Sequence, residues 1–85
     1  IAIMSHTPHE LAEEFPEFVA LMHDLREKDA QFAGLSDKYH TINRAVHRAE
    51  TNVEPTADAH LVEMRKERMH LKDEIYGLLV KQKSQ

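Results

Sequence analysis

The chain has 85 residues, of which 31% are charged, and its formal net charge is −4 at pH 7. This length supports one small core, and the absence of cysteine excludes the disulfides that stabilise many small secreted domains. The acidic residues gather in the N-terminal third, which argues against a nucleic-acid-binding protein because that function needs a basic patch.

The N-terminus lacks the basic stretch and apolar run of a secretory signal peptide. No apolar run in the chain approaches the roughly 20 residues of a membrane-spanning helix, so we expect a cytoplasmic protein without membrane contact. Met4 is the expected natural start, and residues 1–7 are expected to be disordered or partly left over from cloning. Residues 8–84 are expected to form a single helical domain.

The stretch before Pro16 predicts a short helical extension. Thr7 and Glu10 have the spacing of a capping box, and Pro8 would take the first helical position, where no N–H donor is needed. Pro16 removes a backbone donor, so the extension is expected to kink or to restart there. Over 17–51 nothing in the sequence forbids one continuous helix, which is the first long helix of the prediction.

Apolar side chains recur at spacings of three and four along this helix and along a second one. Such spacing puts a narrow apolar stripe on each helix, as in a coiled coil. Pro55 disfavours helix at the residue before it, so we expect a loop over 52–57 and a second helix over 58–81. The first stripe consists of Leu11, Phe18, Leu25, Phe32, Tyr39, Val46 and Val53, with a second column, offset by three, of Leu21, Lys28, Leu35, Ile42 and Ala49. The second consists of Leu61, Met64, Arg68, Leu71, Ile75 and Leu78.

A loop this short makes the two helices antiparallel neighbours. The expected fold is therefore all-α, an antiparallel two-helix, coiled-coil-like hairpin with an N-terminal helical extension. Matching the two stripes brings Val46 opposite Met64 and Leu35 opposite Ile75.

Two helices cannot bury every apolar side chain of this chain. Either the N-terminal segment folds back as a third helix, or another chain covers the remaining apolar residues. The candidate interface residues are Phe15, Phe18, Met22, Val62, Met69, Tyr76 and Leu79.

The run Lys66–Tyr76, together with Val53–Pro55 and Asp29–Phe32, resembles the YdcH-like family of small bacterial proteins. The resemblance extends over about residues 17–79. It implies a short helical hairpin in a bacterial cytoplasm, with no established activity, cofactor or catalytic residue. The N-terminal extension has no counterpart in this resemblance.

Seven histidines raise the question of a metal site. Glu67 and His70, followed by Glu74 one turn later, have the spacing of half a carboxylate-bridged di-iron site. Such sites need a matching pair that faces the core from a second helix, whereas His70 lies off the apolar stripe and the first helix offers no such pair. We therefore expect no metal and no cofactor. Without a cysteine, a nucleophile elbow or a glycine-rich phosphate loop, we also expect no enzymatic activity.

Arg68 interrupts the apolar stripe of the second helix, opposite Ile42 and beside Tyr39. A polar residue there can fix register or oligomeric state, or its stem can pack while the guanidinium reaches water. In both cases Arg68→Leu is expected to raise or preserve stability. If a carboxylate from elsewhere holds Arg68, the same substitution should instead be costly.

The function predicted from these patterns is that of a non-enzymatic helical interaction module. It would self-associate, or bind an unidentified protein partner, through its apolar helix stripes. A nucleic-acid-associated regulatory protein is the alternative, and a metal-binding helical bundle is a more remote one. Gel-shift assays with DNA and RNA would test the first alternative, and metal analysis of the purified protein would test the second.

Overall fold

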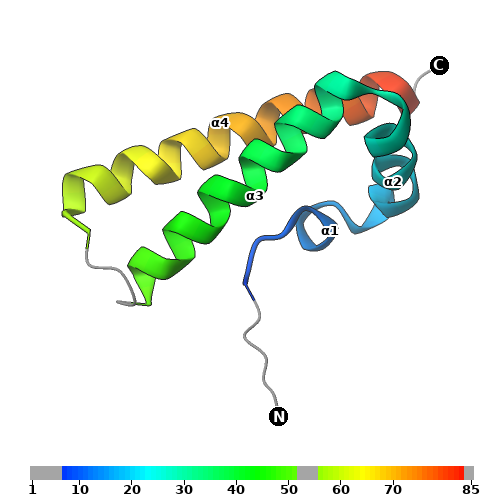
Figure 1. The fold of residues 1–85 in the computed structure, drawn as a ribbon. Helices are drawn as coiled ribbons and strands as arrows, with labels where there is room; N and C mark the ends of the chain where they lie inside the picture. Colours follow the sequence, from blue (N-terminus) through cyan, green and yellow to red (C-terminus); the bar gives the residue numbers. More distant parts are fainter. Residues whose placement is uncertain (1–6, 52–55, 84–85) are drawn as a thin grey trace, which may run out of the picture.

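A computed structural model of the chain describes residues 7–51 and 56–83. All regular structure in these ranges is helical, which confirms the predicted all-α class. The elements are α1 (Leu11–Glu14), the 3-10 turn η1 (Pro16–Phe18), α2 (Val19–Lys28), α3 (Ala30–Glu50) and α4 (Asp58–Lys83). Helices α3 and α4 run in opposite directions and pack on each other, and the segment from α1 to α2 folds back at one end of this pair (Figure 1).

The first long helix is broken at Asp29, which corrects the continuous helix predicted over 17–51. Asp29 has extended backbone angles, φ −125° and ψ 106°, between the end of α2 and the start of α3. Its carboxylate accepts hydrogen bonds from the backbone N–H groups of Gln31 and Phe32, at 2.9 Å and 3.2 Å. Asp29 is therefore the N-cap of α3, a role that aspartate fills readily.

The capping box predicted at Thr7 and Glu10 does not form. Helix α1 begins only at Leu11, and Glu10 precedes it without a side-chain capping bond. His9 adopts a positive φ of 65°, a conformation uncommon outside glycine, and so turns the chain just before α1. The turn directs backbone carbonyl groups toward α3, as described below, instead of starting a helix.

The other predicted boundaries agree with the structure. Helix α1 ends at Glu14 and the chain resumes as η1 at Pro16, as the proline predicts. Helix α4 begins at Asp58, where the second helix was predicted to begin, and ends two residues later than predicted, at Lys83. Most of the predicted loop, and the residues before Thr7, lie outside the described ranges.

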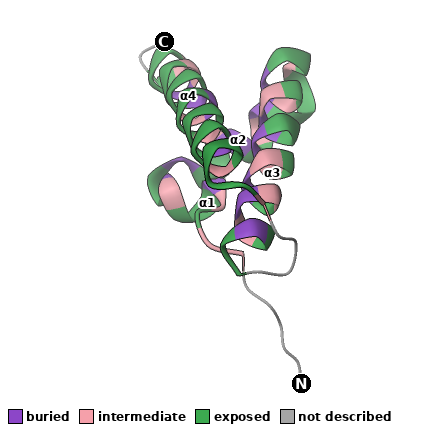
Figure 2. Cartoon of the chain, turned by 90° about the vertical axis from the view of Figure 1, so that its left-hand side faces the viewer, coloured by how far each residue is buried: buried purple, intermediate pink, exposed green. Residues whose placement is uncertain are grey.

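The core consists of two clusters along the α3–α4 pair, and buried residues line the inner sides of the helices (Figure 2). The smaller cluster contains Val46, Ala49 and Met64. The larger one contains Leu11, Phe15, Phe18, Met22, Leu25, Phe32, Tyr39, Leu71, Ile75 and Leu79. Val46 and Met64 share one cluster, and Leu35 packs against the cluster that holds Ile75, in keeping with the predicted register.

Four residues predicted to form an interface are core residues of this chain instead. Phe15, Phe18, Met22 and Leu79 are each less than a tenth exposed. They are buried because the break at Asp29 lets α2 turn back over the ends of α3 and α4. The sequence left open whether the apolar N-terminal segment folds back on its own chain or is covered by another chain. In the structure it folds back on its own chain.

Candidate functional site

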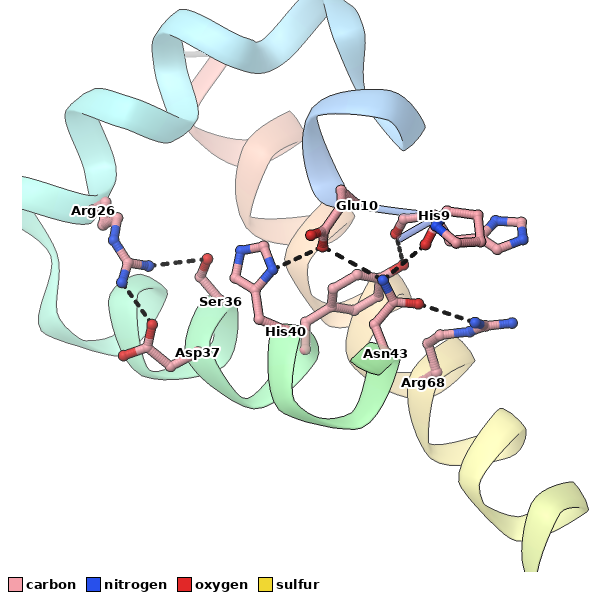
Figure 3. A network of polar contacts seen from close by, with 10 residues as sticks. His9, Glu10, Arg26, Ser36, Asp37, His40, Asn43 and Arg68 are labelled. Carbon is pink, nitrogen blue, oxygen red and sulfur yellow. Dashed lines mark hydrogen bonds and ion pairs between the residues drawn. The ribbon is translucent and has the colours of Figure 1, made fainter. Parts of the chain in front are cut away.

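One side of α3 holds the N-terminal turn through polar side chains (Figure 3). The Tyr39 hydroxyl donates a hydrogen bond to the backbone carbonyl of His9 at 2.6 Å. The Asn43 side-chain amide donates to the backbone carbonyl of Pro8 at 2.9 Å. Both side chains are buried, so each needs the partner that it finds.

Arg68 of α4 extends this network. Its Nη1 donates to the Asn43 Oδ1 at 3.0 Å, while the Asn43 Nδ2 also lies 3.4 Å from the Glu10 carboxylate. The same Glu10 oxygen lies 3.0 Å from the Nδ1 of His40. Arg68 thus pairs with a buried amide of its own chain, a partner that the apolar patterns did not reveal.

Two further polar contacts attach the N-terminal segment. At the far end from the turn, Arg26 of α2 donates to Asp37 at 2.6 Å and to Ser36 at 3.2 Å, both on α3 (Figure 3). Lys72 of α4 donates to the Glu14 carboxylate at 2.5 Å. Polar contacts therefore hold both ends of this segment against the helix pair.

Two of these groups have shifted pKa values. The hydrogen bond from Lys72 lowers the pKa of the Glu14 carboxyl below its ordinary value. Burial raises the pKa of the Tyr39 phenol to about 12. The Glu14 shift thus follows from a contact that holds the segment in place, and the Tyr39 shift follows mainly from the burial of its phenol.

The outer face of α4 carries a stripe of three apolar side chains that remain about half exposed in the described chain. Val62, Met69 and Tyr76 recur every seven residues and are 44%, 60% and 47% exposed. Seven residues are close to two helical turns, so the three side chains lie in a line along the helix. The outward face of α4 is exposed along most of its length in Figure 2.

The stripe meets the N-terminal segment at Tyr76. The Tyr76 ring stacks on Phe15, with ring centroids 5.5 Å apart, and meets Phe18 edge-on at 6.3 Å. Three of the seven predicted interface residues, Val62, Met69 and Tyr76, remain on the surface, and the other four are buried.

The three metal candidates do not come together as a site. His70 Nε2 lies 3.3 Å from Glu74 Oε1, an exposed contact within one helix. Glu67 instead borders an open depression next to Lys38 and Ile42. Over residues 7–51 and 56–83, no three His, Asp or Glu side chains are arranged to hold a metal ion.

Three cations, Arg65, Arg68 and Lys72, line an open depression between α4 and the N-terminal turn. Arg65 donates to the Glu50 carboxylate at 2.7 Å and 3.0 Å, and the other two have the partners described above. The cations of this depression therefore bind acceptors within the chain, unlike the free basic patch that phosphate binding requires.

The fold and these contacts define a small all-helical protein built on the α3–α4 pair. The chain belongs to a family described as a protein of unknown function, DUF465, whose model matches residues 32–79. The match covers nearly all of α3 and most of α4, and it leaves out α1, η1 and α2. No curated protein and no solved structure matches the chain. Within the described residues, no helix has the length and apolar character to cross a membrane.

Proposed function

We propose that this protein is a non-enzymatic helical interaction module that self-associates through the Val62, Met69 and Tyr76 stripe of α4. The observation that carries the proposal is the exposure of these three apolar side chains in one line. Exposed apolar side chains that recur every seven residues on an otherwise charged helix favour a surface that another helix covers.

The charges beside the stripe favour an antiparallel pairing of two α4 helices. In a two-fold arrangement centred on Met69, Val62 of one copy lies opposite Tyr76 of the other. Lys66 and Asp73 lie on the same flank of the stripe, so each would face its opposite charge across the pair. Exposed ion pairs of this kind add little affinity, but they set the relative direction of the helices.

The cellular setting is part of the same proposal. The resemblance of Lys66–Tyr76 to YdcH-like proteins supports a bacterial origin, and the lack of cysteine throughout the sequence supports a cytoplasmic location. The proposal includes no cofactor and no nucleic acid ligand.

Analytical ultracentrifugation of the full chain tests this function. At micromolar concentration we expect a species larger than the 9.9 kDa monomer. Met69→Glu places a charge at the centre of the stripe and should yield monomers of unchanged helix content. His70→Glu is the matched control, because it adds a charge to an exposed neighbouring side chain off the stripe and should leave the mass unchanged.

Equal masses for Met69→Glu and the unmodified chain would contradict this interface. A monomer at every concentration would contradict self-association as a whole.

A further inference from the structure

The joint between α2 and α3 is a single residue. Asp29 alone separates the two helices, and it is the only residue between Val19 and Glu50 that lies outside a helix. The seven-residue apolar repeat continues across this joint, from Leu25 to Phe32. The same residues can therefore form one straight helix, as their pattern predicts, or two helices that fold back on each other.

The folded-back segment, residues 7–28, packs against α3 and α4, which both follow Asp29 in the chain. Its apolar residues pack against α3 and α4 in the larger core cluster. Its polar contacts run from His9 to Tyr39, from Glu14 to Lys72 and from Arg26 to Asp37. Each of these contacts could be made equally well by the same segment of a second copy.

We propose that the chain exchanges residues 7–28 with a second copy of itself by straightening at Asp29. In the exchanged dimer, α2 and α3 form one continuous helix, and each segment occupies the apolar face of the other copy's α3–α4 pair. The receiving face contains Phe32, Tyr39, Leu71, Ile75 and Leu79.

The energetic difference between the two forms is small. Straightening removes the two capping bonds of Asp29. It also lets the free carbonyls at the end of α2 bond to the free N–H groups at the start of α3. All packing between the segment and the helix pair is retained, which is why segment exchange is a low-cost route to dimers.

This exchange is separate from the proposed pairing of α4 stripes. The receiving face is buried in the folded-back form, whereas the stripe is exposed in it. The family match begins at Phe32, so it contains the receiving helix pair and leaves out the segment that would be exchanged. The occupant that the structure offers for this face is therefore the chain's own N-terminal segment, from the same copy or from a second one.

Two substitutions at the joint test the proposal in opposite directions. Asp29→Ala removes the cap and favours the straight helix. Because a cap of this kind is worth about a factor of five per chain and a dimer contains two, dimerisation should strengthen about twenty-five-fold. Ala30→Pro puts proline at the first position of α3, where it is favoured, and restricts Asp29 to the extended backbone that it already has. Ala30→Pro should therefore weaken this dimerisation about tenfold or more.

A charge-exchange experiment shows whether the segment crosses between copies. Glu14→Lys and Lys72→Glu each place like charges together, both in a folded-back monomer and in a dimer of one variant. In a mixed exchanged dimer, both contacts between positions 14 and 72 join opposite charges, one in the original sense and one reversed. With Asp29→Ala in both chains, mixing the two variants should therefore give mixed dimers and a higher melting temperature than either variant alone.

Native mass spectrometry separates the outcomes. Mixed dimers that persist when Met69→Glu is added to both chains support segment exchange, whatever the fate of stripe pairing. The exchange is overturned if mixing the Glu14→Lys and Lys72→Glu chains gives no mixed dimers and no rise in melting temperature. Equal dimerisation of Asp29→Ala and Ala30→Pro also overturns it, and that result leaves stripe pairing to be judged by Met69→Glu alone.

Discussion

At the scale of single residues, Asn43 shows how a buried amide is accommodated between helices. It is fully buried, its Nδ2 donates to the Pro8 carbonyl, and its Oδ1 accepts from Arg68. Within the described residues, every buried side-chain nitrogen or oxygen has a hydrogen-bond partner. The polar groups of the core are therefore paired, which is the condition under which burying them is tolerated.

Arg68→Leu is now expected to lower stability, contrary to the expectation from the apolar stripe. The substitution leaves the Asn43 Oδ1 without its donor, which should cost about 1–3 kcal/mol of unfolding free energy. Urea denaturation measures the change. Arg65→Leu is the control, since its exposed pair with Glu50 should contribute about 1 kcal/mol or less. A stabilised Arg68→Leu chain would mean that the guanidinium is dispensable to Asn43.

Tyr39→Phe should change how stability depends on alkaline pH. Burial raises the pKa of Tyr39 from 10.0 to about 12, so the folded chain keeps the phenolic proton where the unfolded chain has lost it. The stability from this difference is fully present below pH 10 and is lost as the pH rises toward about 12. Denaturation at several pH values should show that the unfolding free energy of Tyr39→Phe falls less steeply as the pH rises above 10. Tyr76→Phe, at a half-exposed position, should keep the original loss; identical profiles for all three chains would contradict the assignment.

At the scale of elements, helix α3 buries a partly polar stripe in place of the fully apolar one. The buried positions are Phe32, Ser36, Tyr39, Asn43, Val46 and Ala49. Leu35 and Ile42, which continue the apolar spacing, are only partly buried. The side of α3 that bears Ser36 and Asn43 is buried because the N-terminal segment lies over it, whereas α4 alone would favour the side of Leu35 and Ile42.

Ile75→Ala should measure how well the α3–α4 contact is packed. Ile75 is fully buried in the larger core cluster, so truncation should cost about 2–5 kcal/mol of unfolding free energy. Met69→Ala, on the exposed stripe of the same helix, should change the monomer's stability by about 0.5 kcal/mol or less. Thermal or urea denaturation below the concentration of self-association gives both values. Equal losses would mean that the stripe is as buried in solution as the core.

At the scale of the whole molecule, the N-terminal segment is attached to the α3–α4 pair by apolar packing in the core and by polar contacts at its edge. Glu14 binds Lys72 and lies 3.4 Å from His9, and Glu10 lies against His40. These contacts join residues about 30 to 58 positions apart, apart from the His9–Glu14 pair. The acidic N-terminal third is therefore used in part to attach the segment to His40 of α3 and Lys72 of α4.

Acid should release this segment before it unfolds the helix pair. The pKa of Glu14 is lowered in the folded chain, so its stabilising effect is present above the ordinary value of 4.5 and is lost as the pH falls through the lowered value. Hydrogen-exchange protection over residues 11–28 should then fall at a higher pH than protection over residues 61–79. In Glu14→Gln the Lys72 pairing is already absent, so the segment should be less protected at neutral pH and less sensitive to acid. Simultaneous loss of protection in both regions would contradict separate release.

The local pattern of the chain was sufficient for its helical class and for several helix ends. The spacing of three and four residues, Pro16 and the start of the second helix at Asp58 predicted the all-α class and most helix boundaries. The same spacing predicted the clusters that hold Val46 with Met64 and Leu35 with Ile75. These features follow from residues close together in sequence, whose backbone preferences act before any distant contact forms.

Only the tertiary structure decided the break at Asp29, the burial of Asn43 and the partner of Arg68. A break in a helix leaves backbone carbonyl and N–H groups without intrahelical partners, which is unfavourable. The periodic pattern therefore does not predict a break at Asp29. The reason for the break is non-local, because folding back buries the apolar side chains of the N-terminal segment against α3 and α4. Periodicity identified the side chains that had to be buried, whereas the turn at Asp29 determined which surface would bury them.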